Sequence, residues 1–598
     1  MTTIPDLIQQ AAAEAVRTIW GVTVAPADLT INETKKEFTG DFTLVTFPLT
    51  KHKLGSPEQI GEKLGAHLVA SLELLSGYNV IKGFLNLSLS DTAWLGFVAS
   101  AAQTPDFFRN TWGAGQTVVV EYCSPNTNKP LHLGHLRNIV LGYALREIMA
   151  ANGFHAVPVC LFNDRGTNIS KSMLAWQRAG LNETPEQAGV KGDKLVGNYY
   201  VKFAQQLKAE VAALQAEGLS PEAAEAQAPS NLAIRDMTVR WEAGDPDTRA
   251  LWKTMNGWVY TAMEDTFRRL GVNFERYYYE SDIYLKGKET VQEGLENGIF
   301  FQKPDGSIWV DLQPDGLDQK LLLRSYGTSV YITQDLALAD EKYQAYRMDR
   351  SIHVVGNEQD YHFKVLFLIM QKLHKPFASG LYHLSYGMVE LPTGKMKSRE
   401  GTVVDADDLL DEMITQAAAE TQQLGKTEGM DEHALQALYE TLGIGALKYF
   451  LLKVDPRKRM VFDPNESIDM HGHTGPFIQS SYTRTASIRR KADTQALTAF
   501  SPDLPLEEPL LDAERQVMRT VMRYPQTLRE AAETYNPALI ANYAYELAKD
   551  YNRFYHEAPV LRTAFPHTST FRLALSSLVG DTLRESLRLI GINVPERM

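Results

Sequence analysis

Two histidines three positions apart, His132 and His135, form the first group in the sequence that suggests chemistry. They stand between a β-branched apolar run at 116–121 and an amphipathic stretch at 132–151, so we expect a loop that leads from a strand into a helix. A helix start offers free backbone N–H groups and the positive end of the helix dipole, which suits a triphosphate. Gly134 would let such a ligand approach the backbone, and both histidines would donate hydrogen bonds to phosphate oxygens as negative charge shifts.

Two other interpretations of this H-x-G-H pair stay open at this point. An isolated pair is more often two helix-start histidines without a chemical role. Histidine pairs also bind zinc, but no third ligand is evident nearby in the sequence. The position directly after a strand favours phosphate over metal, and we predict no metal ligand in the chain.

A second candidate lies far downstream at 394–401, where the sequence reads GKMKSREG. Such a glycine-bounded basic loop can close over phosphates and neutralise a leaving pyrophosphate. Taken alone, an exposed charged hairpin would be the favoured interpretation.

The elements around the two motifs predict an α/β fold. A strand at 116–121, the helix at 132–151 and a second strand at 157–162 make the strand–helix–strand unit of a parallel sheet. Between about 180 and 300 the pattern is helical and polar, which we interpret as an insertion between two halves of the sheet. The α/β pattern then returns in three segments: a strand at 351–356, a helix at 361–373 and a strand at 382–390.

The flanking regions have different patterns. Residues 1–110 combine a first helix at 6–20 with strand-like runs at 42–48 and 84–89, which predicts a small α+β domain. Residues 111–405 would form the Rossmann-like parallel-sheet domain with its helical insertion. The remainder is predicted to be helical, as a connecting segment at 406–465 and a C-terminal all-helical domain at 466–598.

Composition excludes several classes of protein. The 598 residues carry a net charge of −13, which argues against a generic DNA-coating protein but allows local basic patches. The two cysteines cannot build a disulfide framework or a Cys₄ zinc site, as expected in a reducing cytosol. The acidic residues near the N-terminus argue against a signal peptide, and we expect no segment that spans a bilayer.

Together the H-x-G-H segment and the basic loop resemble the two signatures of class I aminoacyl-tRNA synthetases. Within that class the chain resembles arginyl-tRNA synthetases nearly end to end. The strongest local matches are at 121–135 (EYCSPNTNKPLHLGH), 323–335 (LRSYGTSVYITQD), 359–362 (QDYH), 475–484 (GPFIQSSYTR) and 595–598 (PERM). The resemblance implies ligation of L-arginine to tRNA(Arg) with ATP and Mg²⁺, by a cytoplasmic monomer that uses neither DNA nor a membrane. It also implies that the C-terminal domain binds the anticodon.

The basic loop departs from the family's usual Met-Ser-Thr-Arg-x-Gly, because Lys397 and Ser398 replace Ser-Thr. The second lysine that is common in the class falls on Ser398. We therefore expect Lys129 to supply the missing charge, so that Lys129 and Lys395 both bind phosphate, and we assign no role to Lys397. By analogy with the class, the strand end around Met388 would present backbone groups to the adenine ring.

Arginine requires a site that binds a planar, permanently charged guanidinium, and a carboxylate does so in a bidentate geometry. Tyr331 and Asp335 lie four apart in a predicted helix and so project from one face. Spacing alone favours a core tyrosine and a surface aspartate, but both positions match the family's arginine ligands, and the resemblance reverses that preference. Glu121, at the end of the first strand, would add a second negative charge near the guanidinium. Asn126 and Gln359 match family residues that hold the α-ammonium and carboxylate end.

The resemblance also suggests tRNA contacts in the C-terminal region. Arg484 begins a basic helical stretch that can follow phosphates. Aromatic side chains stack on unpaired bases, and the candidates are Phe477, Tyr551 and Tyr555. Met598 stands at the terminus that contacts the anticodon in the family, while the N-terminal domain resembles the part that contacts the outer corner of tRNA.

Three rival identities are weaker. A cysteinyl-tRNA synthetase would need zinc-binding cysteines, and two cysteines do not supply them. A glutamyl-tRNA synthetase would need a basic amino-acid pocket, whereas Glu121 and Asp335 are acidic. A non-catalytic tRNA-binding paralogue could lose its phosphate ligands, yet all of the predicted ones are present.

Overall fold

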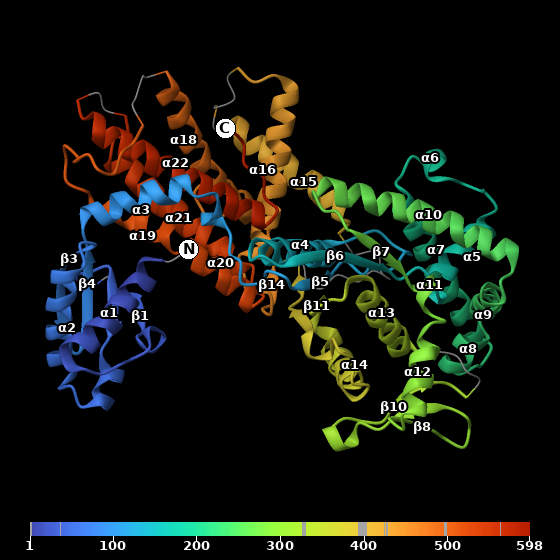
Figure 1. The fold of residues 1–598 in the computed structure, drawn as a ribbon. Helices are drawn as coiled ribbons and strands as arrows, with labels where there is room; N and C mark the ends of the chain where they lie inside the picture. Colours follow the sequence, from blue (N-terminus) through green and yellow to red (C-terminus); the bar gives the residue numbers. More distant parts are fainter. Residues whose placement is uncertain are drawn as a thin grey trace.

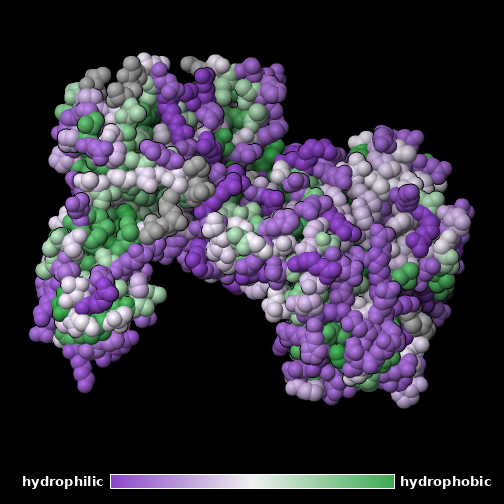
Figure 2. All heavy atoms as spheres, in the orientation of Figure 1, coloured by the Kyte–Doolittle hydropathy of each residue, from purple (hydrophilic) through white to green (hydrophobic). Residues whose placement is uncertain are grey.

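The computed structural model describes residues 3–35, 37–325, 330–390, 392, 404–423, 425, 429–494, 499–561 and 564–598. Figure 1 shows an N-terminal domain at one end of the molecule, a central parallel sheet, and a helical bundle packed beside the sheet. Figure 2 shows that this face is mostly hydrophilic and that a broad hollow separates the N-terminal domain from the lobe on the opposite side. None of the described helices is both long enough and apolar enough to cross a bilayer.

The N-terminal domain packs helices against an antiparallel sheet of strand order β1-β2-β4-β3. Its first helix begins at a capping box between Thr3 and Asp6 and ends at Gly21, whose φ of 71° is the left-handed conformation that glycine adopts without strain. These features confirm the predicted α+β character. The elements are α1 (Ile4–Trp20), β1 (Ile31–Glu33), β2 (Phe42–Val45), α2 (Pro57–Ser71), β3 (Leu75–Ile81), β4 (Phe84–Leu89) and α3 (Asp91–Gln103).

The central sheet has five parallel strands in the order β12-β11-β5-β6-β7. Its middle strand carries the fully buried run Val118–Val120, which fits a strand covered on both faces. The chain leaves this strand toward β6 on one side and later adds β11 and β12 on the other, so the strand order reverses beside β5. Ligands of open α/β sheets bind at such a reversal, beyond the carboxyl ends of the strands. The strands are β5 (Thr117–Glu121), β6 (His155–Phe162), β7 (Arg276–Tyr279), β11 (Arg350–Gly356) and β12 (Leu381–Tyr386).

The Rossmann-like sheet and its helical insertion are therefore confirmed, but the span of about 180–300 predicted for the insertion is wrong at β7, which belongs to the sheet itself. The insertion between β6 and β7 contains α5 (Thr167–Ala179), α6 (Pro185–Ala188), α7 (Gly192–Ala216), α8 (Pro221–Gln227), α9 (Pro229–Glu242) and α10 (Pro246–Arg269). A second, three-stranded antiparallel sheet of strand order β10-β9-β8 follows β7 and was not predicted from the sequence. This region contains α11 (Glu280–Ile283), α12 (Gly287–Glu296), β8 (Phe300–Gln302), β9 (Ile308–Val310), β10 (Lys320–Leu323), α13 (Tyr331–Tyr346) and α14 (Asp360–Lys372).

The strand predicted at 382–390 is interrupted at Gly387 and Met388. Its end is the separate two-residue strand β13 (Val389–Glu390), which pairs in parallel with β14 (Met460–Val461). The prediction of an all-helical chain after 406 is thus wrong at β14 alone among the described residues. The helices there are α15 (Ala406–Gln423), α16 (Glu432–Leu452), α17 (Pro464–Ile468), α18 (Gly475–Asp493), α19 (Asp512–Met522), α20 (Tyr524–Glu533), α21 (Ala538–Glu557) and α22 (Pro566–Leu589).

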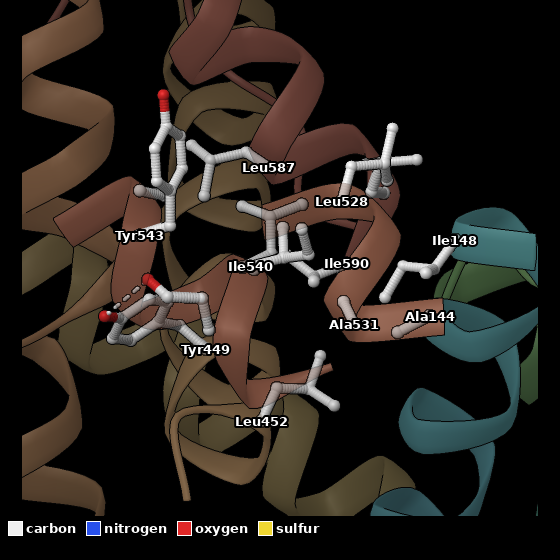
Figure 3. Close-up of a cluster of buried hydrophobic side chains, with 14 of the residues drawn as sticks. Ala144, Ile148, Tyr449, Leu452, Leu528, Ala531, Ile540, Tyr543, Leu587 and Ile590 are labelled. Carbon is white, nitrogen blue, oxygen red and sulfur yellow. Dashed lines mark hydrogen bonds between the residues drawn. The ribbon is translucent and has the colours of Figure 1, made fainter. Parts of the chain in front are cut away.

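The sheet domain and the C-terminal helices share one hydrophobic core through α4 (Leu133–Ala151), the helix that joins β5 to β6. Its C-terminal half contributes Ala144 and Ile148 to a cluster with residues of four other helices (Figure 3). The Tyr449 hydroxyl donates a hydrogen bond to the Ala541 carbonyl at 3.1 Å within this cluster. The partners in the cluster are Tyr449 and Leu452 of α16, Leu528 and Ala531 of α20, Ile540 and Tyr543 of α21, Leu587 of α22, and Ile590 directly after α22.

Candidate active site

The two histidines shape the start of α4, as the sequence predicted. His132 is the N-cap residue, and its Nδ1 accepts a hydrogen bond from the Gly134 N–H at 3.1 Å. The His135 Nδ1 in turn accepts from the His132 N–H at 3.1 Å, and the two ring centroids lie 3.9 Å apart. A Cβ on Gly134 would lie 3.0 Å from the His132 ring, so glycine leaves the ring room to cap the helix.

Both imidazoles are neutral in this arrangement. Each uses Nδ1 as an acceptor, which places the proton on Nε2 and leaves an N–H donor on each ring. Burial, together with the charge of Lys129, lowers the pKa of His132 to about 4. Burial also lowers the pKa of His135 well below its usual value, and His132 and Lys129 add to this effect. At neutral pH both rings are therefore uncharged, and each offers its Nε2–H as a hydrogen-bond donor.

Lys129 is the cation of this cluster, since its charge acts on both histidines. The other predicted phosphate ligand, Lys395, lies outside the described residues, as do Lys397 and Ser398. Downstream of the basic loop, the backbone of Asp405 bridges to His132 and the Ala406 N–H donates to the Leu131 carbonyl at 2.9 Å. The segment after the basic loop is therefore anchored on the start of α4.

The predicted arginine ligands Tyr331 and Asp335 lie in the first turns of α13, at the same edge of the sheet. The Tyr331 side chain is 73% exposed, and the Asp335 carboxylate is 30% exposed. Asp335 Oδ2 lies 2.6 Å from Nε2 of His362 on α14, and this hydrogen bond raises the pKa of His362. The Asp335 carboxylate is thus paired with an imidazole that can gain or lose a proton.

Glu121 has a partner that its sequence position did not reveal. Its carboxylate accepts a hydrogen bond from the Lys342 ammonium at 2.7 Å and lies 3.6 Å from His353, and all three side chains are buried. Burial alone would raise the pKa of Glu121, but Lys342 and His353 outweigh it and lower the pKa. The prediction that Glu121 adds a second negative charge near the guanidinium is corrected accordingly, because Lys342 already matches that charge and fixes α13 to β5.

The second acidic group beside Asp335 is instead Glu280, which sequence reasoning missed. It is only 8% exposed, and burial raises its pKa to about 7, with Arg165 opposing the rise and Asp335 adding to it. Its side chain also bonds to Gln334, and its charge acts on Tyr331. No local spacing links Glu280 to α13, so only the folded chain brings them together.

Asn126 and Gln359 are both exposed and follow the ends of β5 and β11, respectively. Asn126 forms an isolated bridge to Asn163, just beyond β6. Since neighbouring parallel strands end at one edge, both side chains stand on the same side of the sheet as the histidine pair and α13.

Comparison with known proteins identifies the family to which a chain with these features belongs. The model of the catalytic domain of class I tRNA synthetases (R) matches residues 103–463, and that of the DALR anticodon binding domain matches 478–598. An arginine–tRNA ligase of Bacteroides thetaiotaomicron is 47% identical over 596 residues, covering 100% of both chains. The chain belongs to the arginyl-tRNA synthetase family. Another relative of that name, from Amoebophilus asiaticus, is 49% identical and covers 99% of each chain.

Solved structures agree with this membership at the level of the fold. The Thermus thermophilus arginyl-tRNA synthetase has a TM-score of 0.79 at 24% identity, and the Plasmodium falciparum enzyme has a TM-score of 0.76 at 19% identity. Each comparison covers 100% of both chains. The predicted resemblance to arginyl-tRNA synthetases is thus confirmed.

The predicted tRNA-contacting residues differ in accessibility. Arg484 of α18 lies 5.7 Å from the ring of Tyr555, which is 39% exposed, and it bonds to Asn552. Phe477 and Met598 are partly exposed. The prediction that Tyr551 stacks on an unpaired base is wrong. Its ring is fully buried, and its hydroxyl lies 2.9 Å from that of Ser576.

Proposed function

We propose that this protein ligates L-arginine to tRNA(Arg) in two steps at the edge of the parallel sheet. Arginine's carboxylate would attack the α-phosphorus of ATP, which gives arginyl-adenylate and releases pyrophosphate. The 2′-hydroxyl of the terminal adenosine of tRNA would then take the acyl group and release AMP. The observation that carries the proposal is the pair of neutral histidines at a helix start, placed at the same sheet edge as the Asp335 carboxylate.

Catalysis of the first step would rest on positioning and on charge stabilisation. The Nε2–H groups of His132 and His135 would donate to phosphate oxygens at the dipole end of α4, next to Gly134, where a ligand can come close to the backbone. Lys129 and Lys395 would neutralise the pyrophosphate. The Met388 backbone would bind the adenine ring.

Mg²⁺ would enter on the ATP phosphates. The phosphate end offers imidazole and ammonium nitrogens, and Mg²⁺ prefers oxygen ligands. In the part of the chain that the structure describes, no group of three or more His, Cys, Asp or Glu side chains is arranged to hold a metal. The protein would therefore leave the ion to ATP and water.

Recognition of arginine would use the Asp335 carboxylate and the Tyr331 hydroxyl as a fork for the guanidinium. Glu280 would add the second acidic group, since the charge of Asp335 acts on it and its own charge acts on Tyr331. Glu121 would act indirectly, through the ion pair that fixes α13. Asn126 and Gln359 would hold the α-ammonium and carboxylate end.

The tRNA would lie along the helical bundle and the N-terminal domain. Arg484, Tyr555, Phe477 and Met598 are the contacts that we propose at the anticodon, and the hollow in Figure 2 supports a large, elongated ligand. The proposed division is 1–110, 111–405 with its insertion, 406–465 and 466–598. We propose that the protein works as a cytoplasmic monomer, and its two free, buried cysteines fit that compartment.

Exchange of pyrophosphate into ATP, measured with arginine in the presence and absence of tRNA(Arg), tests this function directly. Arginine-dependent exchange together with charging of tRNA supports it. Binding of tRNA without exchange under either condition would identify a non-catalytic tRNA-binding protein instead.

A further inference from the structure

Arg137 lies two residues after the second histidine, on α4, and its side chain is completely buried. Its guanidinium donates hydrogen bonds to four main-chain carbonyls. They belong to Gly387 at 2.5 Å, Met388 at 3.2 Å, Pro456 at 3.2 Å and Lys458 at 2.9 Å. Burial lowers the pKa of Arg137 to about 10, although nearby Tyr386 and Asp455 oppose the shift. Burial of a cation whose partners are all carbonyls costs free energy. All four hydrogen bonds go to two chain segments, one with Gly387 and Met388 and the other with Pro456 and Lys458.

These two segments lie against each other without space between them. The Gly387 N–H donates to the Pro456 carbonyl at 2.9 Å, and the Met460 N–H donates to the Met388 carbonyl at 3.1 Å. A Cβ on Gly387 would lie 2.5 Å from the backbone of Lys458. Arg137 therefore fastens a tight backbone-on-backbone contact to the helix that begins at the histidine pair.

The peptide between Gly387 and Met388 is the unit that Arg137 controls. It is planar and trans, so its C=O and its N–H point in opposite directions. Because the carbonyl is bound to the guanidinium, the Met388 N–H points away from Arg137. A charge-assisted bond to the carbonyl also polarises the peptide, which makes its N–H a stronger donor.

We propose that Arg137 is a positioning residue for the adenine end of ATP. It aims and polarises the Met388 N–H so that this group donates to N1 of adenine. It also sets the distance between the base and the start of α4, where the phosphates bind. This inference rests on the proposed function, which places adenine at Met388.

Nucleotide analogues report on how this edge of the base is recognised. Adenine N1 is an acceptor, whereas the hypoxanthine of ITP carries a hydrogen on N1 and an oxygen in place of the neighbouring 6-amino group, so the Met388 N–H would face another donor. The preference for ATP over ITP therefore measures how well the peptide is aimed. In 7-deaza-ATP the change lies on a different edge of the base, so this analogue serves as the control.

Arg137→Lys tests the proposal, because one ammonium cannot reach four carbonyls in the place of a planar guanidinium. We expect kcat/KM for ATP to fall about 10²-fold, as for a displaced binding group. The preference for ATP over ITP should fall about tenfold, the value of one hydrogen bond. The KM for arginine and the relative rate with 7-deaza-ATP should stay at their wild-type values.

Arg572→Lys is the matched control, since Arg572 is 2% exposed and binds Glu514 at 2.6 Å in the C-terminal bundle. It should lower the melting temperature without changing the preference for ATP over ITP. If Arg137→Lys does not fold, Gly387→Ala carries the same measurement, because its Cβ displaces the same peptide from Lys458.

An unchanged ATP-over-ITP preference in a folded Arg137→Lys protein, with only a lower melting temperature, would overturn the inference and leave Arg137 a purely structural role. Wild-type protein without arginine-dependent exchange would instead overturn the proposed function itself.

Discussion

Replacing Asp335 by asparagine keeps the volume of the side chain and removes the charge that would pair with the substrate guanidinium. Breaking one side of a buried charge pair costs about 2–5 kcal/mol. The Asp335 carboxylate is 30% exposed, so water screens part of that energy. We therefore expect the lower part of the range, about 2–3 kcal/mol, which corresponds to a rise in the KM for arginine of about 30- to 150-fold.

The assay measures the KM for arginine, the KM for ATP and the affinity for tRNA on one preparation of Asp335→Asn. Only the KM for arginine should change. Asp340→Asn is the matched control on the same helix, because Asp340 pairs with Lys375, 3.1 Å away, and is not part of the proposed site. Lysine should remain a poor substrate of the wild type, since a point charge cannot fill a bidentate fork.

The outcome that would refute this reasoning is an unchanged KM for arginine in Asp335→Asn. If Glu280→Gln then raised that KM, Glu280 would be the guanidinium ligand. A parallel rise in the KM for ATP in Asp335→Asn would point to a general disturbance of the sheet edge.

Three further results are expected. His135→Ala should lower kcat about 10²-fold with little change in the KM for arginine, and near-normal charging by this variant would remove His135 from the mechanism. Lys129→Ala should lower the rate of charging as much as loss of the loop lysine Lys395, and adding Ser398→Lys should partly restore that rate. Wild-type charging by Lys129→Ala, with no gain from adding Ser398→Lys, would contradict the shared role of the two lysines. The raised pKa of His362 means that imidazolium competes with the guanidinium for Asp335 at low pH, so the KM for arginine should fall as pH rises through that pKa. Titration of arginine from pH 6 to 9 tests this, and the same dependence in His362→Asn would assign it to another group.

Local patterns carried the predictions that succeeded. The strand, turn and helix around His132 and His135 are encoded within about 30 residues, so periodicity and cap chemistry were enough to place them. The arrangement of α13 also follows from its own sequence. The two histidines also have each other and Gly134 as hydrogen-bond partners within that segment, whereas the partner of Asp335 on α13, His362, comes from another helix.

The predictions that failed, and the residues that sequence reasoning missed, depend on contacts between distant segments. Glu121 and Lys342 are 221 positions apart, and the spacing of neither residue indicates an ion pair. Glu280 follows a long insertion, so its sequence position does not connect it with α13. Arg137 has no distinguishing feature in the sequence, because its carbonyl partners lie about 250 to 321 positions away. Tyr551 was interpreted from residue type alone, which does not reveal that its ring is buried.

The shared use of α4 affects how this chain can be divided. The two family matches end and begin at 463 and 478, which suggests a place to cut. A fragment that ended there would expose Ile148 and Leu452 to water, and the remaining piece would expose Leu528 and Ile590 (Figure 3). Both fragments would have a large apolar surface exposed to water and would tend to aggregate. Exchange of the C-terminal bundle between relatives would therefore require its contact face to be redesigned together with the second half of α4.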